Sequence, residues 1–104
     1  MNIKVSGHNL EITDALKNSV EEKLNKLDRH LHKITQIHAV LHVEKNRHMA
    51  EATVNHKGGQ LRASAESEDM YTTIQQLADK LDRQAIKFKE KTHEHGRGHD
   101  EAEE

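Results

Sequence analysis

The stretch that decides the fold is TQIHAVLHVEKNRHMAEATVNHKGGQLRASAE, residues 35–66. Apolar side chains take every second position in three runs, at residues 37–43, 50–54 and 61–65. Such alternation is typical of strands that bury one face. A polar turn at residues 45–48 separates the first two runs, and KGGQ at 57–60 is a hairpin signal before the third. The stretch therefore predicts a three-stranded antiparallel meander with one solvated face.

Two amphipathic helices are predicted on either side of this meander. Residues 14–31 carry apolar side chains at spacings of four, four, three and four, and Thr13 supplies an N-cap. A second helix is predicted from Met70 to about residue 91, and either Ser67 or Asp69 starts it. The stripes are Leu16, Val20, Leu24, Leu27 and Leu31 on the first helix and Met70, Ile74, Leu77, Leu81, Ala85 and Phe88 on the second.

Residues 2–7 also alternate and predict a short strand at the beginning of the chain. The order of elements therefore predicts an α+β fold, β-α-β-β-β-α, in which two helices pack on one face of a four-stranded sheet. At 104 residues the chain has room for one domain. We expect that domain at residues 1–92 and a flexible, acidic, histidine-rich tail at residues 93–104, where no apolar periodicity remains.

Composition and charge narrow the classes of function. The chain has no cysteine, which excludes a disulfide framework and a cysteine-ligated metal site. No apolar stretch approaches ~20 residues and none opens the chain, so we expect a soluble, cytoplasmic protein without membrane contact. The net charge of -2 averages a mildly basic body with an acidic end, because residues 92–104 hold one basic and five acidic residues. With 2% aromatic residues, binding to nucleic acid would depend on charge and shape rather than on base stacking.

Basic residues form a ridge on each predicted helix, beside the buried stripe. On a helical wheel the second helix carries one continuous ridge, and the first helix carries a similar one with Arg29 at its edge. Lysine and arginine at such spacings suit successive phosphates of a nucleic acid. If the helices lie side by side, the ridges border one exposed groove; the alternative is that they are ordinary solvated surfaces. The ridge residues are Lys80, Arg83, Lys87 and Lys91 on the second helix and Lys23, Lys26, His30 and Lys33 on the first.

Neither an enzyme nor a metalloprotein is indicated. The sequence contains no glycine-rich phosphate loop, no G-x-S-x-G, no H-E-x-x-H and no cysteine nucleophile. Of the ten histidines, His93, His95 and His99 belong to the tail, where a histidine array lacks a fixed second shell. His30 lies among lysines, and its protonation would add charge to the groove. We therefore expect no catalytic residue, no metal and no cofactor.

The sequence resembles two known families to different extents. Its element order is similar to that of a double-stranded RNA-binding domain with an additional first strand, but the start of the last helix, SEDMY at 67–71, is acidic where that family is basic. It resembles the short ribosome hibernation-promoting factors of bacteria more closely, over about residues 1–92. The residues that carry this resemblance are MNI at 1–3, GHNLEIT at 7–13, AL at 15–16, KLNKL at 23–27 and DMYTTIQQLADKLDRQ at 69–84.

The second resemblance implies a protein that binds the small ribosomal subunit and its ribosomal RNA between head and body, in the channel used by messenger and transfer RNA. It implies that translation is inhibited in stationary phase or stress, and that ribosome modulation factor helps to form inactive ribosome dimers. It also implies a monomer when the protein is off the ribosome. The family's RNA-contacting positions correspond to Lys23, Lys26, Arg29, Lys80, Arg83, Lys87 and Lys91.

Three alternatives stay open at this point. A ribosome-associated inhibitor of the protein Y type has a longer tail that opposes dimers, so it would stabilise idle monomeric ribosomes. A generic double-stranded RNA-binding module would bind any plain duplex. A metal carrier or protein-interaction domain would use the histidine tail and would not associate with ribosomes.

Overall fold

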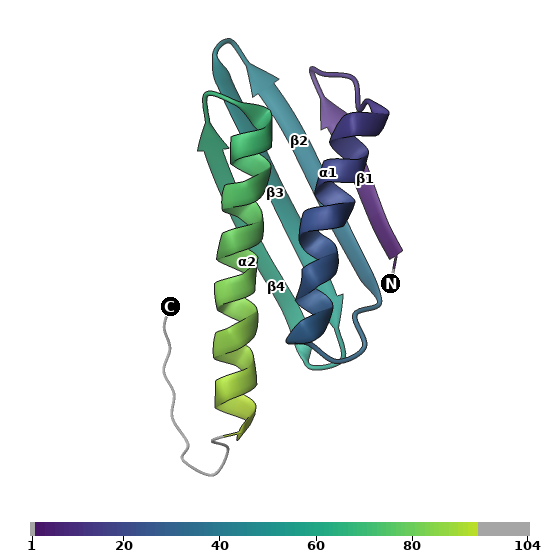
Figure 1. Ribbon diagram of the computed structural model, residues 1–104, viewed down its shortest axis with the longest axis vertical. Helices are drawn as coiled ribbons and strands as arrows, with labels where there is room; N and C mark the ends of the chain where they lie inside the picture. The colour runs from purple at the N-terminus through teal and green to yellow at the C-terminus, as the bar shows by residue number, and fades with distance from the viewer. Residues whose placement is uncertain (1, 94–104) are drawn as a thin grey trace.

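A computed structural model of the chain describes residues 2–93, and it describes side chains as far as residue 89. Figure 1 shows two helices lying on the same face of one sheet. The sheet order is β1-β2-β3-β4, with β1 parallel to β2 and the other neighbours antiparallel. The predicted fold class and element order are therefore confirmed. The elements are β1 Asn2–His8, α1 Asp14–Leu24, the 3-10 helix η1 Asn25–Arg29, β2 Gln36–Glu44, β3 Arg47–His56, β4 Gly59–Ser67 and α2 Met70–His93.

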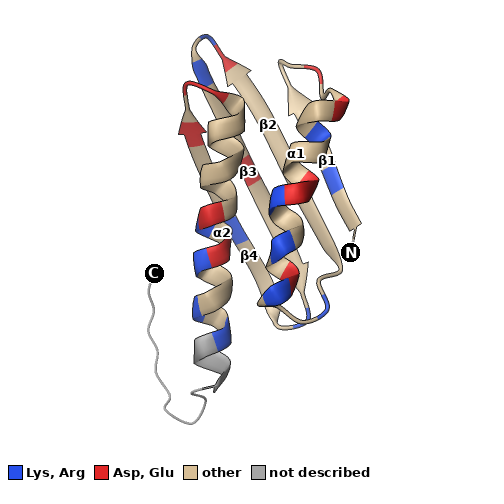
Figure 2. Ribbon diagram, viewed as in Figure 1, with Lys and Arg blue, Asp and Glu red and all other residues tan. Residues whose placement is uncertain are grey.

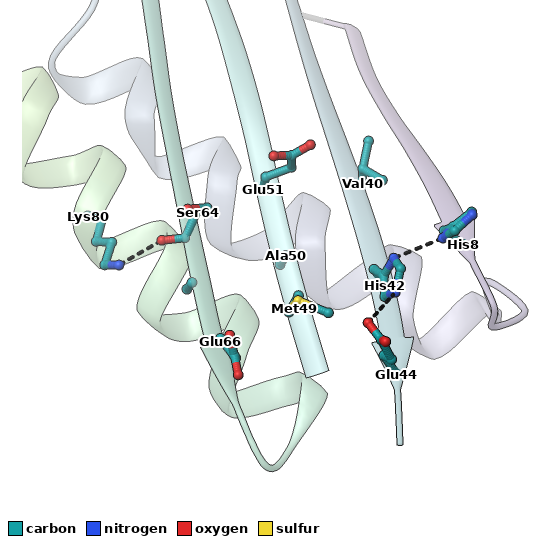
Figure 3. Close-up of a pocket in the computed structure, with 11 residues that line it drawn as sticks. His8, Val40, His42, Glu44, Met49, Ala50, Glu51, Ser64, Glu66 and Lys80 are labelled. Atoms are coloured by element: carbon teal, nitrogen blue, oxygen red, sulfur yellow. Dashed lines mark hydrogen bonds and ion pairs between the residues drawn. The ribbon is translucent and has the colours of Figure 1, made fainter. Parts of the chain in front are cut away.

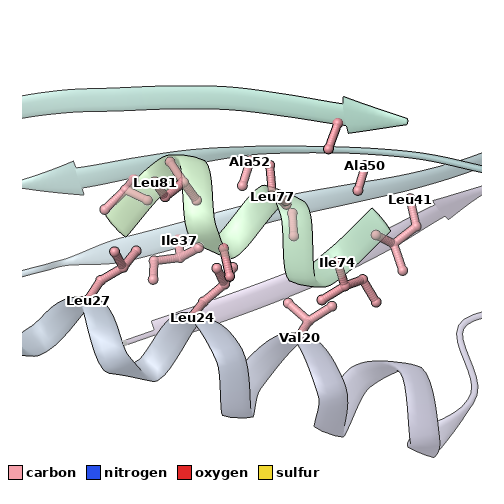
Figure 4. Close-up of a cluster of buried hydrophobic side chains, with 14 of the residues drawn as sticks. Val20, Leu24, Leu27, Ile37, Leu41, Ala50, Ala52, Ile74, Leu77 and Leu81 are labelled. Carbon is pink, nitrogen blue, oxygen red and sulfur yellow. The ribbon is translucent and has the colours of Figure 1, made fainter. Parts of the chain in front are cut away.

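The core lies between the helices and the covered face of the sheet, as the apolar alternation predicts. Leucines and a valine from α1 and η1 meet the buried stripe of α2 above isoleucine, leucine and alanine side chains of the strands (Figure 4). Small alanines on β3 let α2 approach the sheet closely. The core includes Val20, Leu24, Leu27, Ile37, Leu41, Ala50, Ala52, Ile74, Leu77 and Leu81.

The first helix is shorter than predicted. The expectation of an α-helix over 14–31 is wrong, because α1 ends at Leu24 and η1 continues it as a 3-10 helix. A 3-10 helix has about three residues per turn, so the apolar step of three between Leu24 and Leu27 keeps both side chains in the core. Because of the tighter winding, polar residues three positions apart, such as Lys26 and Arg29, lie on the same side of η1.

Both helix starts follow the expected caps. Thr13 Oγ1 accepts a hydrogen bond from the Leu16 amide at 3.2 Å. At the start of α2, Asp69 Oδ2 accepts from the Thr72 amide at 2.8 Å, so Asp69 is the N-cap. This hydrogen bond from the Thr72 amide holds the pKa of the Asp69 carboxyl below its ordinary value.

The opposite face of the sheet has no helix on it in the part of the chain that the structure describes. No helix within residues 2–93 is long and apolar enough to cross a membrane. Residues 94–104 lie outside the described residues, so the predicted tail and its boundary with the domain stay predictions.

Candidate nucleic-acid interface

Three of the predicted basic residues line a small groove between the two helices. Lys23 comes from the last turn of α1, and Lys26 and Arg29 come from η1. The groove has a volume of about 150 Å³. Because η1 winds at about three residues per turn, Lys26 and Arg29 stack on one side of it. Arg29 Nε also donates to the Lys26 carbonyl oxygen at 3.1 Å, which orients the guanidinium.

The other wall of this groove is acidic rather than basic. α2 contributes Gln75, Asp79 and Asp82 to it. One carboxylate oxygen of Asp82 lies 3.9 Å from the Arg29 guanidinium and 3.1 Å from Nε2 of His30. The Asp79 carboxylate accepts a hydrogen bond from Gln75 at 3.0 Å. A phosphate that entered this groove would therefore meet cations on one wall and carboxylates on the other.

The outer side of α2 carries the second basic surface. Lys80 Nζ donates to the carbonyl oxygen of Ser64 on β4 at 2.6 Å. This bond directs Lys80 toward the free edge of the sheet and away from α1. Arg83 and Lys87 are exposed, and neither has an ion pair within the described residues. In Figure 2 the middle of α2 carries acidic and basic residues together, whereas its last described turns carry basic residues alone.

The expectation that both ridges border one groove is therefore wrong. The groove between the helices takes its cations from α1 and η1 only, while Lys80, Arg83 and Lys87 belong to the outer face of α2. The reason is rotational: the α2 positions that face α1 are 75, 78, 79 and 82, which lie on the opposite flank of the buried stripe from the basic ridge. The helical layer thus presents two basic surfaces separated by Asp79 and Asp82.

The three remaining predicted residues are His30, Lys33 and Lys91. His30 and Lys33 do not lie on an α-helix, in contrast to the ridge predicted for the first helix. The His30 side chain is 19% exposed and points to Asp82. Lys33 follows η1 in the connection to β2, with an exposed side chain and a left-handed backbone φ of 51°. Lys91 lies in α2, but the structure does not describe its side chain.

A shallow hollow of about 710 Å³ on the open face of the sheet is an alternative site (Figure 3). His8 and His42 face each other there with their Nδ1 atoms 2.8 Å apart, so one ring donates and the other accepts. Glu44, Glu51 and Glu66 line the same hollow, which makes it unsuited to a polyanion. Glu66 also accepts from Arg47, which lowers the pKa of the carboxyl. Among the described residues, no group of three or more His, Cys, Asp or Glu side chains is arranged to hold a metal ion.

Comparisons with known proteins identify the family. Residues 3–93 match the family described as Sigma 54 modulation protein / S30EA ribosomal protein. A ribosome hibernation promoting factor from Azotobacter vinelandii is 49% identical over 98 residues, which cover 94% of this chain and 92% of that protein. The ribosome hibernation promoting factor of Escherichia coli (strain K12) is 44% identical over 95 residues, which cover 91% of this chain and 100% of that protein.

Solved structures share the fold. The N-terminal domain of Thermus thermophilus Protein Y superimposes with a TM-score of 0.80 at 39% identity, covering 85% of this chain and 99% of that one. A ribosomal subunit interface protein from Coxiella burnetii gives a TM-score of 0.77 at 33% identity, covering 86% and 99%. The resemblance drawn from the sequence is confirmed, and so is the prediction that the chain is not an enzyme, because its relatives are hibernation factors. The chain belongs to the Sigma 54 modulation protein / S30EA ribosomal protein family.

Proposed function

We propose that this protein silences idle ribosomes in the cytoplasm by binding ribosomal RNA of the small subunit, in the channel that messenger and transfer RNA use. Occupying that channel blocks translation sterically, in stationary phase or stress. Support comes from relatives named ribosome hibernation promoting factors and from a solved relative described as a ribosomal subunit interface protein.

The observation that carries the proposal is the outer face of α2. Arg83 and Lys87 are one helical turn apart, both exposed, and neither forms an ion pair within the described residues. Unpaired cations on a rigid helix can displace counterions from a phosphate backbone without first breaking an internal bond. Among the described residues no aromatic side chain lies on this surface, which suits folded RNA recognised by its backbone and shape.

The groove between the helices contributes the second contact. Lys23 and Lys26 have no ion pair within the described residues, whereas Arg29 forms an ion pair with Asp82. We therefore assign the stronger phosphate contacts to the outer face of α2 and the weaker ones to α1 and η1. Folded RNA is broad enough to span both surfaces, which lie on one helical layer.

Dimer formation is the further part of the proposed function. We propose that ribosomes bound by this protein associate into inactive dimers when ribosome modulation factor is also present. The alternative, the protein Y type of activity, predicts stable idle monomers instead. The two differ only in the particle that forms, because both need the small subunit to be occupied.

Sucrose-gradient sedimentation of purified ribosomes with added protein tests this function. The wild-type chain is expected to co-migrate with the small subunit and, with modulation factor, to move ribosomes into a dimer peak. Arg83→Glu with Lys87→Glu should abolish co-migration, because two phosphate contacts become repulsive. The matched control is Lys4→Glu with Arg62→Glu, which makes the same charge change at exposed positions of strands β1 and β4, on the open face of the sheet.

Each outcome separates one alternative. Equal co-migration of both double variants would overturn the proposed surface. Co-migration of the wild type without any dimer peak would favour the protein Y type. Comparable affinity for a plain RNA duplex and for the small subunit would favour a generic double-stranded RNA module.

A further inference from the structure

A pocket of about 510 Å³ lies at the end of the molecule where η1, the β3–β4 turn and the last described turns of α2 meet. Its volume falls within the usual range for a small-molecule site, about 300–1,000 Å³. Arg29 lines both this pocket and the groove between the helices. The pocket therefore opens beside the surface that we assign to RNA. Its lining includes Arg29, His30, His32, His56, Lys57 and Phe88.

Aromatic rings are concentrated in this pocket, although the chain is poor in them. Phe88 is the only phenylalanine of the sequence. Its ring packs against the His56 imidazole with centroids 4.8 Å apart and planes at 81°. A methyl group added at Gly58 would overlap the Phe88 ring, so the turn backbone itself forms part of the wall. Flat aromatic surfaces of this kind stack with nucleobases.

Two buried imidazole nitrogens of the pocket residues lack partners. His56 is 8% exposed, and its Nδ1 accepts from the Gly58 amide at 3.1 Å. Burial lowers the pKa of His56, so the ring is neutral and this hydrogen bond assigns its proton to Nε2. Nε2 of His56 and Nδ1 of His30 are both buried without a partner within the described residues.

These nitrogens offer complementary hydrogen-bonding groups. His30 Nε2 lies 3.1 Å from Asp82 and donates to it, so its Nδ1 is an acceptor when the ring is neutral. His56 Nε2 is a donor. Buried polar groups without partners are rare in folded proteins and cost free energy. Both atoms have almost no accessible surface, so a nucleobase edge would reach them only after the side chains around the pocket shift.

Positive charge dominates among the residues that line the pocket. Arg29, Lys57 and Lys89 line it, against one carboxylate, that of Asp28. Arg29 and Lys57 come from different elements, η1 and the β3–β4 turn, so their charges flank the pocket from two sides. This arrangement suits an anionic group attached to a flat ring.

We propose that this pocket binds one nucleotide, with its base against Phe88 and the imidazoles and its phosphate between Arg29 and Lys57. The nucleotide is either a free nucleoside monophosphate or an unpaired nucleotide of bound RNA, and only the second source rests on the proposed function. A pocket for one extruded base would add a local contact to a surface that otherwise recognises the backbone.

Amide chemical shifts of the ¹⁵N-labelled chain, titrated with adenosine 5′-monophosphate in the millimolar range, test this proposal. Saturable shifts are expected at Leu31, His56, Gly58 and Phe88, which line the pocket. Inorganic phosphate alone should give smaller shifts, because it lacks the base. A single-stranded adenosine tetranucleotide separates the sources: the same shifts at lower concentration indicate RNA, and shifts with the mononucleotide alone indicate a free nucleotide.

A matched pair of variants supplies the control. Lys57→Glu reverses a lysine of the β3–β4 turn, and Lys45→Glu makes the same change in the β2–β3 turn, at the other end of β3. Nucleotide binding should weaken about three- to tenfold in the first and stay unchanged in the second. Phe88→Leu should weaken binding of the nucleotide but not of phosphate.

Three results would overturn the proposal: no saturable shift with the nucleotide, equal shifts with phosphate alone, or equal weakening in both lysine variants. Failure of the proposed function is seen separately, as unchanged ribosome co-migration of the Arg83→Glu, Lys87→Glu double variant. The nucleotide titration contains no ribosome, so neither result depends on the other.

Discussion

The two basic surfaces of the helical layer contain the same residue types in different surroundings. On α1 and η1, the cations face Asp79 and Asp82 across a narrow groove. On the outer side of α2, Arg83 and Lys87 have no carboxylate partner within the described residues. Phosphate binding at the first surface must compete with carboxylates that already attract the same side chains. Local charge counted along a helix therefore does not measure how strongly that helix binds RNA.

The largest expected change in affinity for the small subunit distinguishes the two basic surfaces. Arg83→Glu with Lys87→Glu should weaken binding to the small subunit by on the order of 100-fold, because both residues are free to contact phosphates. Lys23→Glu with Lys26→Glu should weaken it by on the order of tenfold, since their surroundings are already partly acidic. Filter binding at a single fixed salt concentration measures both. A larger loss from the Lys23 and Lys26 variant would show that α1 and η1 make the stronger phosphate contacts.

A change of opposite sign is expected at the carboxylate between the surfaces. Asp82→Asn should tighten binding by about threefold at low salt, because Arg29 loses its anionic neighbour. Asparagine keeps an acceptor for His30, so the contact between η1 and α2 is retained. Asp14→Asn, in the first turn of α1, removes the same charge far from the groove and should leave affinity unchanged. Weaker binding by Asp82→Asn would show that this carboxylate positions the site.

A smaller difference is expected within α2. Lys87→Gln should weaken binding by about threefold, whereas Lys80→Gln should change it by less than about twofold. Lys80 Nζ is bound to the Ser64 carbonyl oxygen, so its charge is held at the sheet edge. Gln84 makes a similar bond to the Arg62 carbonyl oxygen at 2.9 Å. Equal losses in the same filter-binding assay would show that Lys80 leaves the edge to reach RNA.

The smallest effect concerns the stability of the fold at the end where η1 and α2 meet. Burial lowers the pKa of His56 below its ordinary value of 6.5. Between the lowered pKa and 6.5, the unfolded chain binds a proton that the folded chain does not, so stability falls as the pH drops through this window. His56→Asn should reduce this dependence, which urea midpoints at pH 7.5 and 5.5 would measure. An unchanged pH dependence in the variant would show that other histidines cause it.

Sequence reasoning succeeded where periodicity alone decides the structure. The alternation of residues 35–66 and the stripe from Met70 to Phe88 predicted the meander, the last helix and the buried faces, because burial repeats every two or about 3.6 residues. It failed at the 3-10 segment, because the apolar step of three between Leu24 and Leu27 fits an α-helix as well as a 3-10 helix.

Periodicity could not predict that Asp79 and Asp82 face the cations of α1 and η1. A helical wheel shows that Asp79 and Asp82 lie on the other flank of the α2 stripe, but not that α1 covers that flank. The wheel of the first helix also assumed an α-helix as far as Lys33, which the structure replaces with η1 and a loop. The bond from Lys80 to Ser64 depends on the edge position of β4, which no local pattern contains.

We propose that the outer face of α2 contacts phosphates and that an equal charge elsewhere does not. The salt dependence of binding to the small subunit tests it most directly, because each phosphate contact contributes to the slope of log affinity against log salt. For Arg83→Glu with Lys87→Glu we predict a slope reduced by about two, and for Lys4→Glu with Arg62→Glu an unchanged slope. Equal slopes for the wild type and the α2 variant, or an equal reduction in both variants, would contradict the account.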